Sequence, residues 1–325
     1  MGARAEIFTE GGAGRGYGHV TRCTALAQGL LCEGIPVRVW VDGSDIPTAL
    51  KLQSVEWVSA EWHAGGDEIV GRLGYGFLLL VDSYLAPLST YRSLSAHAGR
   101  SLYVDDYGRL PYPPGIILNS AQSAEGLYTM RPAQSLLLGP AFQPLREPFW
   151  LNPAKEANNP VQAVLITLGG GAPPQAISEL ASAAAREFPA AMVYAVGLPE
   201  APPKPNIIPP GPLGAAEMAR LMEECDIAVS AGGQTLLELA AKGVPVVAVE
   251  TAENQKSNIA GLVAAGAALS AGSVIEPGVA GRVGLLLGRL ADPRVRRRMA
   301  EKGQRLIDGK GVQRVVQALA HGHHA

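Results

Sequence analysis

The chain has 325 residues, enough for about two domains of ordinary size, so a single small binding module is excluded. Hydrophobic residues make up 47% of it and charged residues 17%, a composition that supports large cores and excludes intrinsic disorder. Lys and Arg number 27 against 29 for Asp and Glu, and a net charge of −2 provides no basic field for nucleic acid.

The cysteines and the ends of the chain favour a soluble cytoplasmic protein. Cys23, Cys32 and Cys225 are odd in number and lack a C-x-x-C spacing, which disfavours disulfides and a cysteine zinc site. No apolar signal segment opens the sequence, and the run Phe77–Val81 is far shorter than the about 20 residues that span a bilayer. The histidines at the C-terminal end are His321, His323 and His324, and we interpret them as part of a frayed end. No metal or cofactor is therefore expected.

Short apolar runs alternate with longer helix-like stretches, a pattern typical of β-α-β units with a parallel sheet. The runs do not alternate polar and apolar residues, because both faces of a parallel strand are covered. The first half predicts a helix over Val20–Glu33 and strands over Ala5–Thr9, Val37–Val41, Val55–Val58, Phe77–Asp82, Ser101–Val104, Ile116–Leu118 and Ser135–Leu138.

The Pro- and Asn-rich stretch Gly139–Pro160 interrupts this alternation, which then restarts. We therefore expect an α/β protein of two Rossmann-like doubly wound domains, residues 1–145 and 146–325, facing a cleft at the carboxyl ends of their strands. The second half predicts strands over Ala163–Thr167, Met192–Val196, Ile227–Ser230 and Val246–Val249. Its predicted helices are Gln175–Glu187, Ala215–Glu224, Thr235–Lys242, Gln255–Ala265, Gly281–Leu290, Pro293–Leu306 and Val312–Ala320.

The first loop after a strand, Glu10 to Arg22, contains five glycines, among them Gly16 and Gly18. Glycine lets backbone amides approach a ligand, and the following helix start favours anions, so the loop suits a nucleotide or sugar. His19 begins that helix, where the helix dipole disfavours protonation, and the interpretation is a neutral base that activates water. The alternatives are a capping or packing histidine, and a nicotinamide site that would use Asp42.

Polar residues also end two later strands of the first half. Asp82 is a candidate to orient an imidazole or accept sugar hydroxyls, and Tyr84 to hold a polar group of the substrate. The alternative is a turn-forming Asp and a Tyr that shields the core edge. The similar set Asp105 to Tyr107 is interpreted as a solvated turn.

In the second half, three loops carry candidate nucleotide-binding groups. The glycines Gly169, Gly170 and Gly171 precede a helix and suit an anion. Gly232 and Gly233 expose amides for a diphosphate, and Glu238 can accept both ribose hydroxyls, although Thr235-x-x-Glu238 is also a capping box. Side chains at Asn254 and Gln255 can pair with sugar hydroxyls or an amide, and a loop cap at Asn254 is the alternative.

Several of these segments together carry a family resemblance that covers nearly the whole chain. The motifs, in order, are G-x-G-H-x-x-R-C-x-x-L-A from Gly16, V-D-S-Y from Val81, L-L-G-P-x-F-x-x-L-R from Leu137, the L-G-G-G loop, S-A-G-G-x-T-x-x-E from Ser230, and E-N-Q from Glu253. By these motifs the chain resembles the UDP-sugar hydrolases of pseudaminic acid biosynthesis, relatives of spore coat polysaccharide proteins and of the peptidoglycan N-acetylglucosaminyltransferase.

The resemblance implies a two-domain GT-B type fold and an enzyme that hydrolyses a UDP-linked deoxy amino sugar at its anomeric carbon, releasing UDP. It implies His19, Tyr84 and Asn254 as catalytic residues and Glu238 as the ribose ligand. The N-terminal domain would hold the sugar and the C-terminal domain UDP. The remaining substrate-binding candidates are Gly16, Gly18, Arg22, Asp82, Gly169, Gly170, Gly171, Gly232, Gly233, Gln234, Thr235 and Gln255.

The chain departs from the family pattern at two positions. Phe8 stands where members usually carry Arg, and Gln234 where they carry a small residue. These departures leave open which sugar is attached to UDP and whether water or a hydroxyl accepts it. A GT-B glycosyltransferase with a UDP-sugar donor and a non-catalytic nucleotide-sugar-binding protein remain the alternatives, and the sequence does not indicate an oligomeric state.

Overall fold

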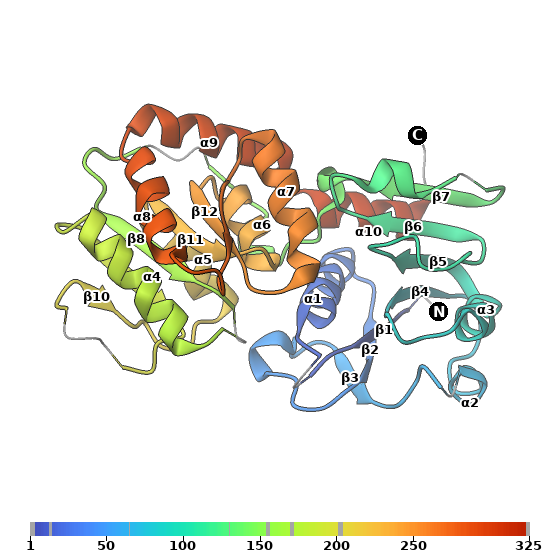
Figure 1. The fold of residues 1–325 in the computed structure, drawn as a ribbon. Coiled ribbons are helices and arrows are strands. Elements are labelled where there is room, and N and C mark those ends of the chain that lie inside the picture. The colour runs from blue at the N-terminus through green and yellow to red at the C-terminus, as the bar shows by residue number, and fades with distance from the viewer. Residues whose placement is uncertain are drawn as a thin grey trace. The chain divides into compact units, whose positions relative to one another are not determined.

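A computed structural model describes residues 4–12, 15–64, 66–129, 131–153, 157–169, 172–200 and 204–322. The chain forms two compact units, each built on its own sheet (Figure 1). Unit 1 comprises the described residues up to Glu147 together with those from Lys310 onward, and unit 2 those from Pro148 to Gly309.

Unit 1 contains a parallel sheet in the order β3-β2-β1-β4-β5-β6-β7. The chain order reverses between β1 and β4, and in open α/β sheets ligands bind beyond the carboxyl ends of the strands at such a reversal. The strands are β1 (Ala5–Glu10), β2 (Val37–Asp42), β3 (Glu56–Ser59), β4 (Phe77–Asp82), β5 (Ala98–Val104), β6 (Gly115–Asn119) and β7 (Gln134–Leu138).

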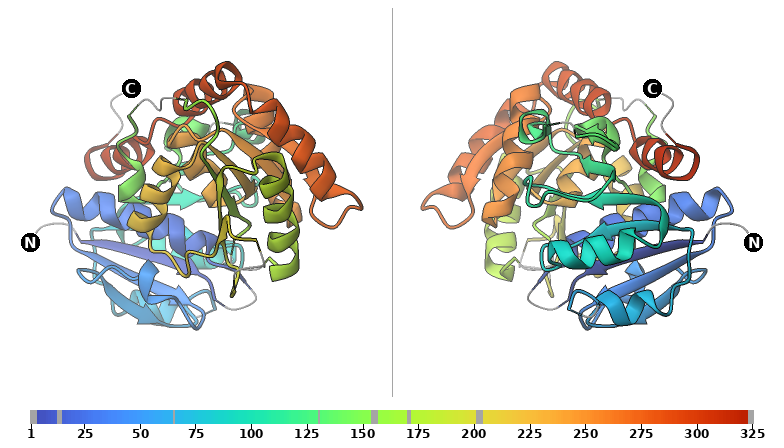
Figure 2. Two further views of the ribbon diagram at one scale, coloured as in Figure 1. Left: turned by 90° about the vertical axis from the view of Figure 1, so that its left-hand side faces the viewer. Right: turned by 90° about the vertical axis from the view of Figure 1, so that its right-hand side faces the viewer.

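Helices cover both faces of the unit 1 sheet, as the two side views in Figure 2 show. The core on one face is aromatic: the Phe8 ring stacks on Trp40 at 5.7 Å between centroids and meets the edge of Trp62 at 5.3 Å. The helices are α1 (Gly18–Cys32), α2 (Gly66–Val70), α3 (Leu88–Ser95) and α10 (Gly311–His321), with 3₁₀ turns η1 (Thr48–Leu50), η2 (Ala124–Leu127), η3 (Pro140–Phe142) and, at the unit boundary, η4 (Glu147–Phe149).

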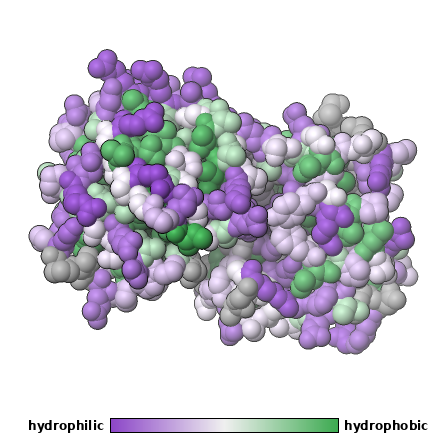
Figure 3. Space-filling view, viewed as in Figure 1, coloured by the Kyte–Doolittle hydropathy of each residue, from purple (hydrophilic) through white to green (hydrophobic). Residues whose placement is uncertain are grey.

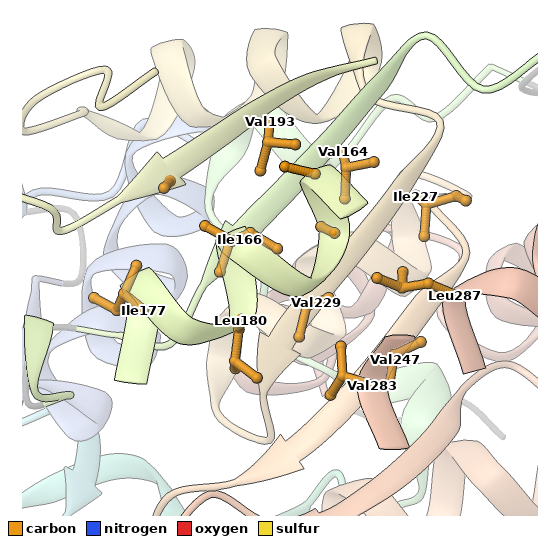
Figure 4. Packing of buried hydrophobic residues seen from close by; sticks show 14 of the residues in the cluster. Val164, Ile166, Ile177, Leu180, Val193, Ile227, Val229, Val247, Val283 and Leu287 are labelled. Carbon is orange, nitrogen blue, oxygen red and sulfur yellow. The ribbon is translucent and has the colours of Figure 1, made fainter. Parts of the chain in front are cut away.

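Unit 2 repeats the arrangement with a parallel sheet in the order β10-β9-β8-β11-β12-β13 and a core of Val, Ile, Leu and Ala side chains (Figure 4). Its reversal lies between β8 and β11. The strands are β8 (Ala163–Thr167), β9 (Met192–Val196), β10 (Ile207–Ile208), β11 (Ile227–Ala231), β12 (Val246–Glu250) and β13 (Leu269–Ser273). The helices are α4 (Pro174–Glu187), α5 (Ala215–Glu224), α6 (Gln234–Ala241), α7 (Lys256–Ala265), α8 (Val279–Arg289) and α9 (Pro293–Leu306), with the 3₁₀ turn η5 (Glu253–Gln255).

The expected class, two Rossmann-like α/β domains, is confirmed, and the predicted strands and helices lie within a few residues of the observed ones. The sequence did not predict four short elements: α2, α3, β10 and β13. Strands β10 and β13 are the two edges of their sheet, where a half-exposed strand needs no continuous apolar run.

The C-terminal helix belongs to a different unit from the one expected. The sequence analysis assigned everything after residue 145 to one domain, whereas α10 packs on α1 of unit 1. The contact is close: a Cβ at Gly29 of α1 would lie 2.3 Å from the Cγ1 atom of Val312. His321, expected in a frayed tail, ends this helix with its Nε2 atom 3.6 Å from Glu33, while His323 and His324 lie outside the described residues.

The outer surface is polar over the region of unit 2 where α9 lies, and apolar groups are scattered elsewhere on the visible face (Figure 3). This fits the exposed arginines of that helix. In the part of the chain that the structure describes, no helix is both long and apolar enough to span a membrane.

We expect Gly29→Ala to destabilise the protein by about 1–3 kcal/mol, because the added methyl group overpacks the contact between α1 and α10. The control is Gly284→Ala in α8, where no described atom lies within 4 Å of the added carbon. That change should stabilise the protein by about 0.5–1 kcal/mol through helix propensity. Urea unfolding measures both, and equal effects would contradict the packing argument.

Candidate active site

Three polar segments of unit 1 meet at the carboxyl edge of its sheet, on either side of the reversal between β1 and β4. Strand pairing aligns Thr9 with Asp82, so the end of β1, carrying Glu10, lies beside the end of β4. Asp82 in turn pairs with Val104, so the residues that follow β5, including Asp106, come next along the edge. Helix α1 starts above these strand ends and carries His19 and Arg22 on its first turns.

The carboxylate of Asp82 is the centre of this cluster and is fully buried. The Nδ1 atom of His19 lies 2.6 Å from its Oδ1 atom. Because an ionised carboxylate only accepts hydrogen bonds, Nδ1 carries the proton and Nε2 presents a lone pair. Within the described structure Nε2 has no hydrogen-bond partner, and 14% of the His19 side chain is exposed. The pair therefore presents an oriented and partly exposed imidazole, whose Nε2 atom has a lone pair when the ring is neutral.

Arg22 joins Asp82 to a second carboxylate, Asp106. Its Nε and Nη2 atoms donate to Asp82 at 2.5 and 2.7 Å, and its Nη1 and Nη2 atoms donate to Asp106, both at 2.9 Å. Four of the five guanidinium N–H donors are thus used within the protein. Arg22 holds the cluster together, and its expected contact with substrate stays a prediction.

Tyr84 completes the cluster on the side of Asp106. Its hydroxyl donates to the Oδ2 atom of Asp106, and its ring lies edge-on to the His19 imidazole with centroids 4.4 Å apart. The Tyr107 ring follows at 5.5 Å from that of Tyr84. The expectation that residues 105–107 form a solvated turn is wrong for both acids. Asp105 is buried, and Asp106 binds Arg22 and Tyr84.

Burial and charge set the protonation of these groups. Burial raises the pKa of Asp82, but the charge of Arg22 and the hydrogen bonds from Arg22 and His19 outweigh it and hold that pKa well below its usual range. The pKa of Asp106 is likewise lowered, because Arg22 outweighs the effect of burial. Burial first, and then the Asp106 charge, raise the pKa of Tyr84 well above its usual value. Both carboxylates are therefore ionised and Tyr84 keeps its proton near neutral pH.

Glu10 fixes the backbone that carries Tyr84. Its carboxylate accepts from the Ser83 hydroxyl, from the Tyr84 amide at 2.8 Å and, more weakly, from the Leu85 amide at 3.4 Å. A buried carboxylate at the end of β1 thus holds the loop after β4. The sequence motif V-D-S-Y gave no sign of this partner, which is 73 residues away from Ser83.

Asp42, the residue that a nicotinamide site would use, has other partners. Its Oδ1 atom accepts from Arg15 at 3.1 Å, and its Oδ2 atom contacts the Nδ1 atom of His63. Both oxygens are engaged within unit 1, which disfavours a bidentate contact with ribose hydroxyls. His63 was not found by sequence reasoning, since no motif surrounds it.

Unit 2 brings its predicted residues together at the carboxyl edge of β8, β11 and β12, which are neighbours in the sheet. Gly169 follows β8 with φ +78°, whereas Gly170 and Gly171 lie outside the described residues. Gly233 is the N-cap of α6, so Thr235 is not a cap and the capping-box alternative is wrong. Glu238 lies one turn into α6 and is fully buried.

The loop between β11 and α6 is held by Gln255. Its Oε1 atom accepts from the amides of Gly232 at 3.1 Å and Thr251 at 3.0 Å. The Gly232 amide, expected to hold a diphosphate, is used in this contact. A Cβ at Gly232 would also lie 2.6 Å from Ile259, so packing accounts for this glycine, while Asn254 is exposed.

Each unit has an open glycine where a helix begins at the reversal of its sheet. No described atom lies within 4 Å of a Cβ built at Gly18 in unit 1 or at Gly233 in unit 2. Gly16 is open as well and has φ +78°, a conformation that favours glycine. Among the described residues, no group of three or more His, Cys, Asp and Glu side chains forms a metal site.

No protein-family model matches the chain. It is similar to the spore coat polysaccharide biosynthesis protein SpsG of Bacillus subtilis (strain 168), at 26% identity over 349 aligned positions that cover 96% of each chain. It is also similar to a Helicobacter pylori (strain ATCC 700392 / 26695) protein described as pseudaminic acid cytidylyltransferase and UDP-2,4-diacetamido-2,4,6-trideoxy-beta-L-altropyranose hydrolase. That match has 26% identity over 244 positions and covers 74% of this chain and 43% of the relative. The resemblance expected from the motifs is confirmed.

Solved structures show the same fold at low identity. Acinetobacter baumannii MurG aligns with a TM-score of 0.58 and 16% identity, covering 97% of this chain and 99% of that one. Phytolacca americana UGT2, solved with UDP-2-fluoro-glucose and pterostilbene, aligns with a TM-score of 0.67 and 12% identity over 98% and 99%. The fold is that of the two-domain GT-B glycosyltransferases.

We expect Asp82→Asn to lower the free energy of unfolding at pH 7 by about 3 kcal/mol, because it breaks a buried ion pair with Arg22. The folded pKa of Asp82 lies below the unfolded value of about 3.9, so this stabilisation is full above that value and is lost as the pH falls below it. Urea unfolding at pH 7, 5 and 3.5 should show the wild-type advantage shrinking on acidification.

The matched control is Asp45→Asn, an exposed carboxylate of the same unit whose positive φ also accommodates Asn. It should change stability little at any of these pH values. A difference between wild type and Asp82→Asn that does not vary with pH would show that folding does not lower the pKa of Asp82, and a wild-type advantage that grows on acidification would show that Asp82 is protonated in the folded protein.

Proposed function

We propose that the chain is a nucleotide-sugar hydrolase, which cleaves a UDP-linked deoxy amino sugar at the anomeric carbon and releases UDP and the free sugar. The observation that carries this proposal is the His19–Asp82 pair at the sheet reversal of unit 1, in which the hydrogen bond uses Nδ1 and the imidazole side chain is partly exposed. The similarity to the H. pylori protein, whose description includes a UDP-sugar hydrolase, supports the reaction type.

In the proposed reaction, Nε2 of His19 takes a proton from water while the water oxygen bonds to the anomeric carbon. The bond from that carbon to the diphosphate oxygen breaks, and UDP leaves with its electron pair. Asp82 holds the ring orientation and stabilises the imidazolium that forms, as the buried carboxylate of a triad does. The oriented imidazole is the general base of this reaction.

The two units would divide the substrate. Four of the Arg22 donors are used and both neighbouring carboxylates are ionised, so the unit 1 cluster repels a diphosphate and suits a sugar. We assign UDP to unit 2, where open space at Gly233 adjoins the start of α6 and Glu238 can serve the ribose. Gly169, Gln234, Thr235 and Gln255 belong to the same edge and remain proposed substrate contacts, and Asn254 beside them remains a proposed catalytic residue.

A glycosyltransferase is the second candidate, since MurG and other glycosyltransferases share the fold. It would use the same base with an acceptor hydroxyl in place of water. Incubating the protein with a panel of UDP-sugars and no acceptor separates the candidates. UDP plus free sugar indicates hydrolysis, UDP only with an acceptor indicates transfer, and binding without turnover indicates a nucleotide-sugar-binding protein.

We expect His19→Asn to reduce turnover by about a hundredfold or more, because Asn can still donate toward Asp82 but cannot act as the base. UDP affinity, measured by calorimetry, should stay near the wild-type value. The control is His97→Asn: this histidine precedes β5 at the opposite edge of the sheet and should tolerate the change. Full turnover by His19→Asn would refute the mechanism.

We expect Glu238→Gln to weaken UDP binding by about 1–3 kcal/mol, the scale of charge-assisted hydrogen bonds to the ribose. The substitution keeps the size of this buried side chain, and Glu224→Gln at the exposed end of α5 is the matched control. Calorimetry with UDP measures both variants. Unchanged affinity for Glu238→Gln would leave this glutamate a structural role only.

A further inference from the structure

Asp106 is the most exposed charged group of the unit 1 cluster. About 24% of its side chain is accessible, against 15% for Arg22 and none for Asp82. Its Oδ1 atom accepts from one Arg22 nitrogen, and its Oδ2 atom accepts from another and from the Tyr84 hydroxyl. A carboxylate has about four acceptor positions, so Asp106 retains one for a ligand.

At Asp106, Tyr84 and His19 the hydrogen-bond directions leave acceptors, not donors, for a ligand. The single hydroxyl hydrogen of Tyr84 goes to Asp106, so its oxygen presents only lone pairs outward. The Nδ1 proton of His19 goes to Asp82, and four of the five Arg22 N–H donors are directed at the two carboxylates. A ligand group must therefore donate a hydrogen bond to be recognised by Asp106, Tyr84 or His19.

The charges of the unit 1 cluster also favour ligand groups that donate hydrogen bonds. Two ionised carboxylates face one guanidinium, and the buried Glu10 carboxylate lies at the end of the neighbouring strand. A further carboxylate brought by a ligand would be repelled by the accessible Asp106 and would find no unused cation in the cluster. Hydroxyl and amide N–H groups carry no charge, so they are not repelled by Asp106 and need no cation as a partner.

We propose that Asp106 is a specificity-determining residue, which restricts the sugar moiety to uncharged sugars with hydroxyl or amide donors and excludes acidic sugars such as uronic acids. The inference rests on the proposed function, because it takes unit 1 as the sugar site. Nothing in the motif sequence singled out Asp106, since its partners Arg22 and Tyr84 are 84 and 22 residues away.

The test compares binding of UDP-glucose and UDP-glucuronate, which differ only in a hydroxymethyl or a carboxylate at C6. Calorimetry on the His19→Asn protein avoids turnover, and UDP alone is the reference ligand. We expect UDP-glucuronate to bind about tenfold more weakly than UDP-glucose, a like-charge effect moderated by partial solvent exposure. Adding Asp106→Asn should narrow the ratio to about threefold or less and leave UDP affinity unchanged.

Two further variants distinguish the charge from other effects. Tyr84→Phe removes an acceptor without removing charge, so UDP-glucose should bind a few-fold more weakly while UDP-glucuronate gains nothing. Glu125→Gln, an exposed carboxylate in the turn after β6, should leave the ratio at its original value.

Equal binding of the two UDP-sugars before any change at Asp106, or a ratio that Asp106→Asn does not narrow, overturns the inference. The inference is also overturned if Glu125→Gln narrows the affinity ratio of the two UDP-sugars as much as Asp106→Asn does, since the effect would then come from the net charge of the protein. These results leave the proposed hydrolase intact. Absence of UDP binding by every variant is a different failure, which refutes the proposed function and the inference with it.

Discussion

The unit 1 site depends on one buried carboxylate at the end of its central strand. Asp82 has no contact with solvent, so the free energy of burying its charge must be offset by partners within the protein. Arg22 and His19 supply them from the first turns of α1, and both side chains are thereby fixed in direction. The same electrostatic requirement that stabilises the fold therefore orients the imidazole, so the orientation of His19 and folding stability cannot be varied independently here.

The cluster extends outward from Asp82 in layers of decreasing burial. Arg22 carries its charge to Asp106, and Asp106 fixes the hydroxyl of Tyr84, whose ring borders the imidazole. The reversal of unit 2 is held in a different way in the part of the chain that the structure describes. There an amide side chain, Gln255, joins two loops through neutral hydrogen bonds, beside an open glycine at the start of α6. Two units of one topology thus present chemically different edges.

Much of the fold could be predicted because buried parallel strands such as β1 and β4 are continuous apolar runs, and because glycines mark the turns that follow them. His19, Asp82 and Tyr84 could be predicted because they lie at the end of a strand, in the loop after it, or at the start of the helix that follows that loop. The residues that contact them could not be predicted. Apolar periodicity shows which face of α10 is buried, but not that this face packs against Gly29, and no local sequence pattern links Arg22 to Asp106. The role of Gln255 was missed for the same reason, since its contact with Gly232 spans 23 residues.

The placement of α10 makes unit 2 a continuous insertion within unit 1. During synthesis, domains generally fold as they emerge, the N-terminal one first. Here that order is reversed at the end: every segment of unit 2 leaves the ribosome before the helix that covers Gly29. Until then, the nascent unit 1 exposes the apolar face of α1 against which α10 later packs. A polypeptide released early would have a complete unit 2 beside an unfinished unit 1, and chaperones and proteases act on such exposed surfaces.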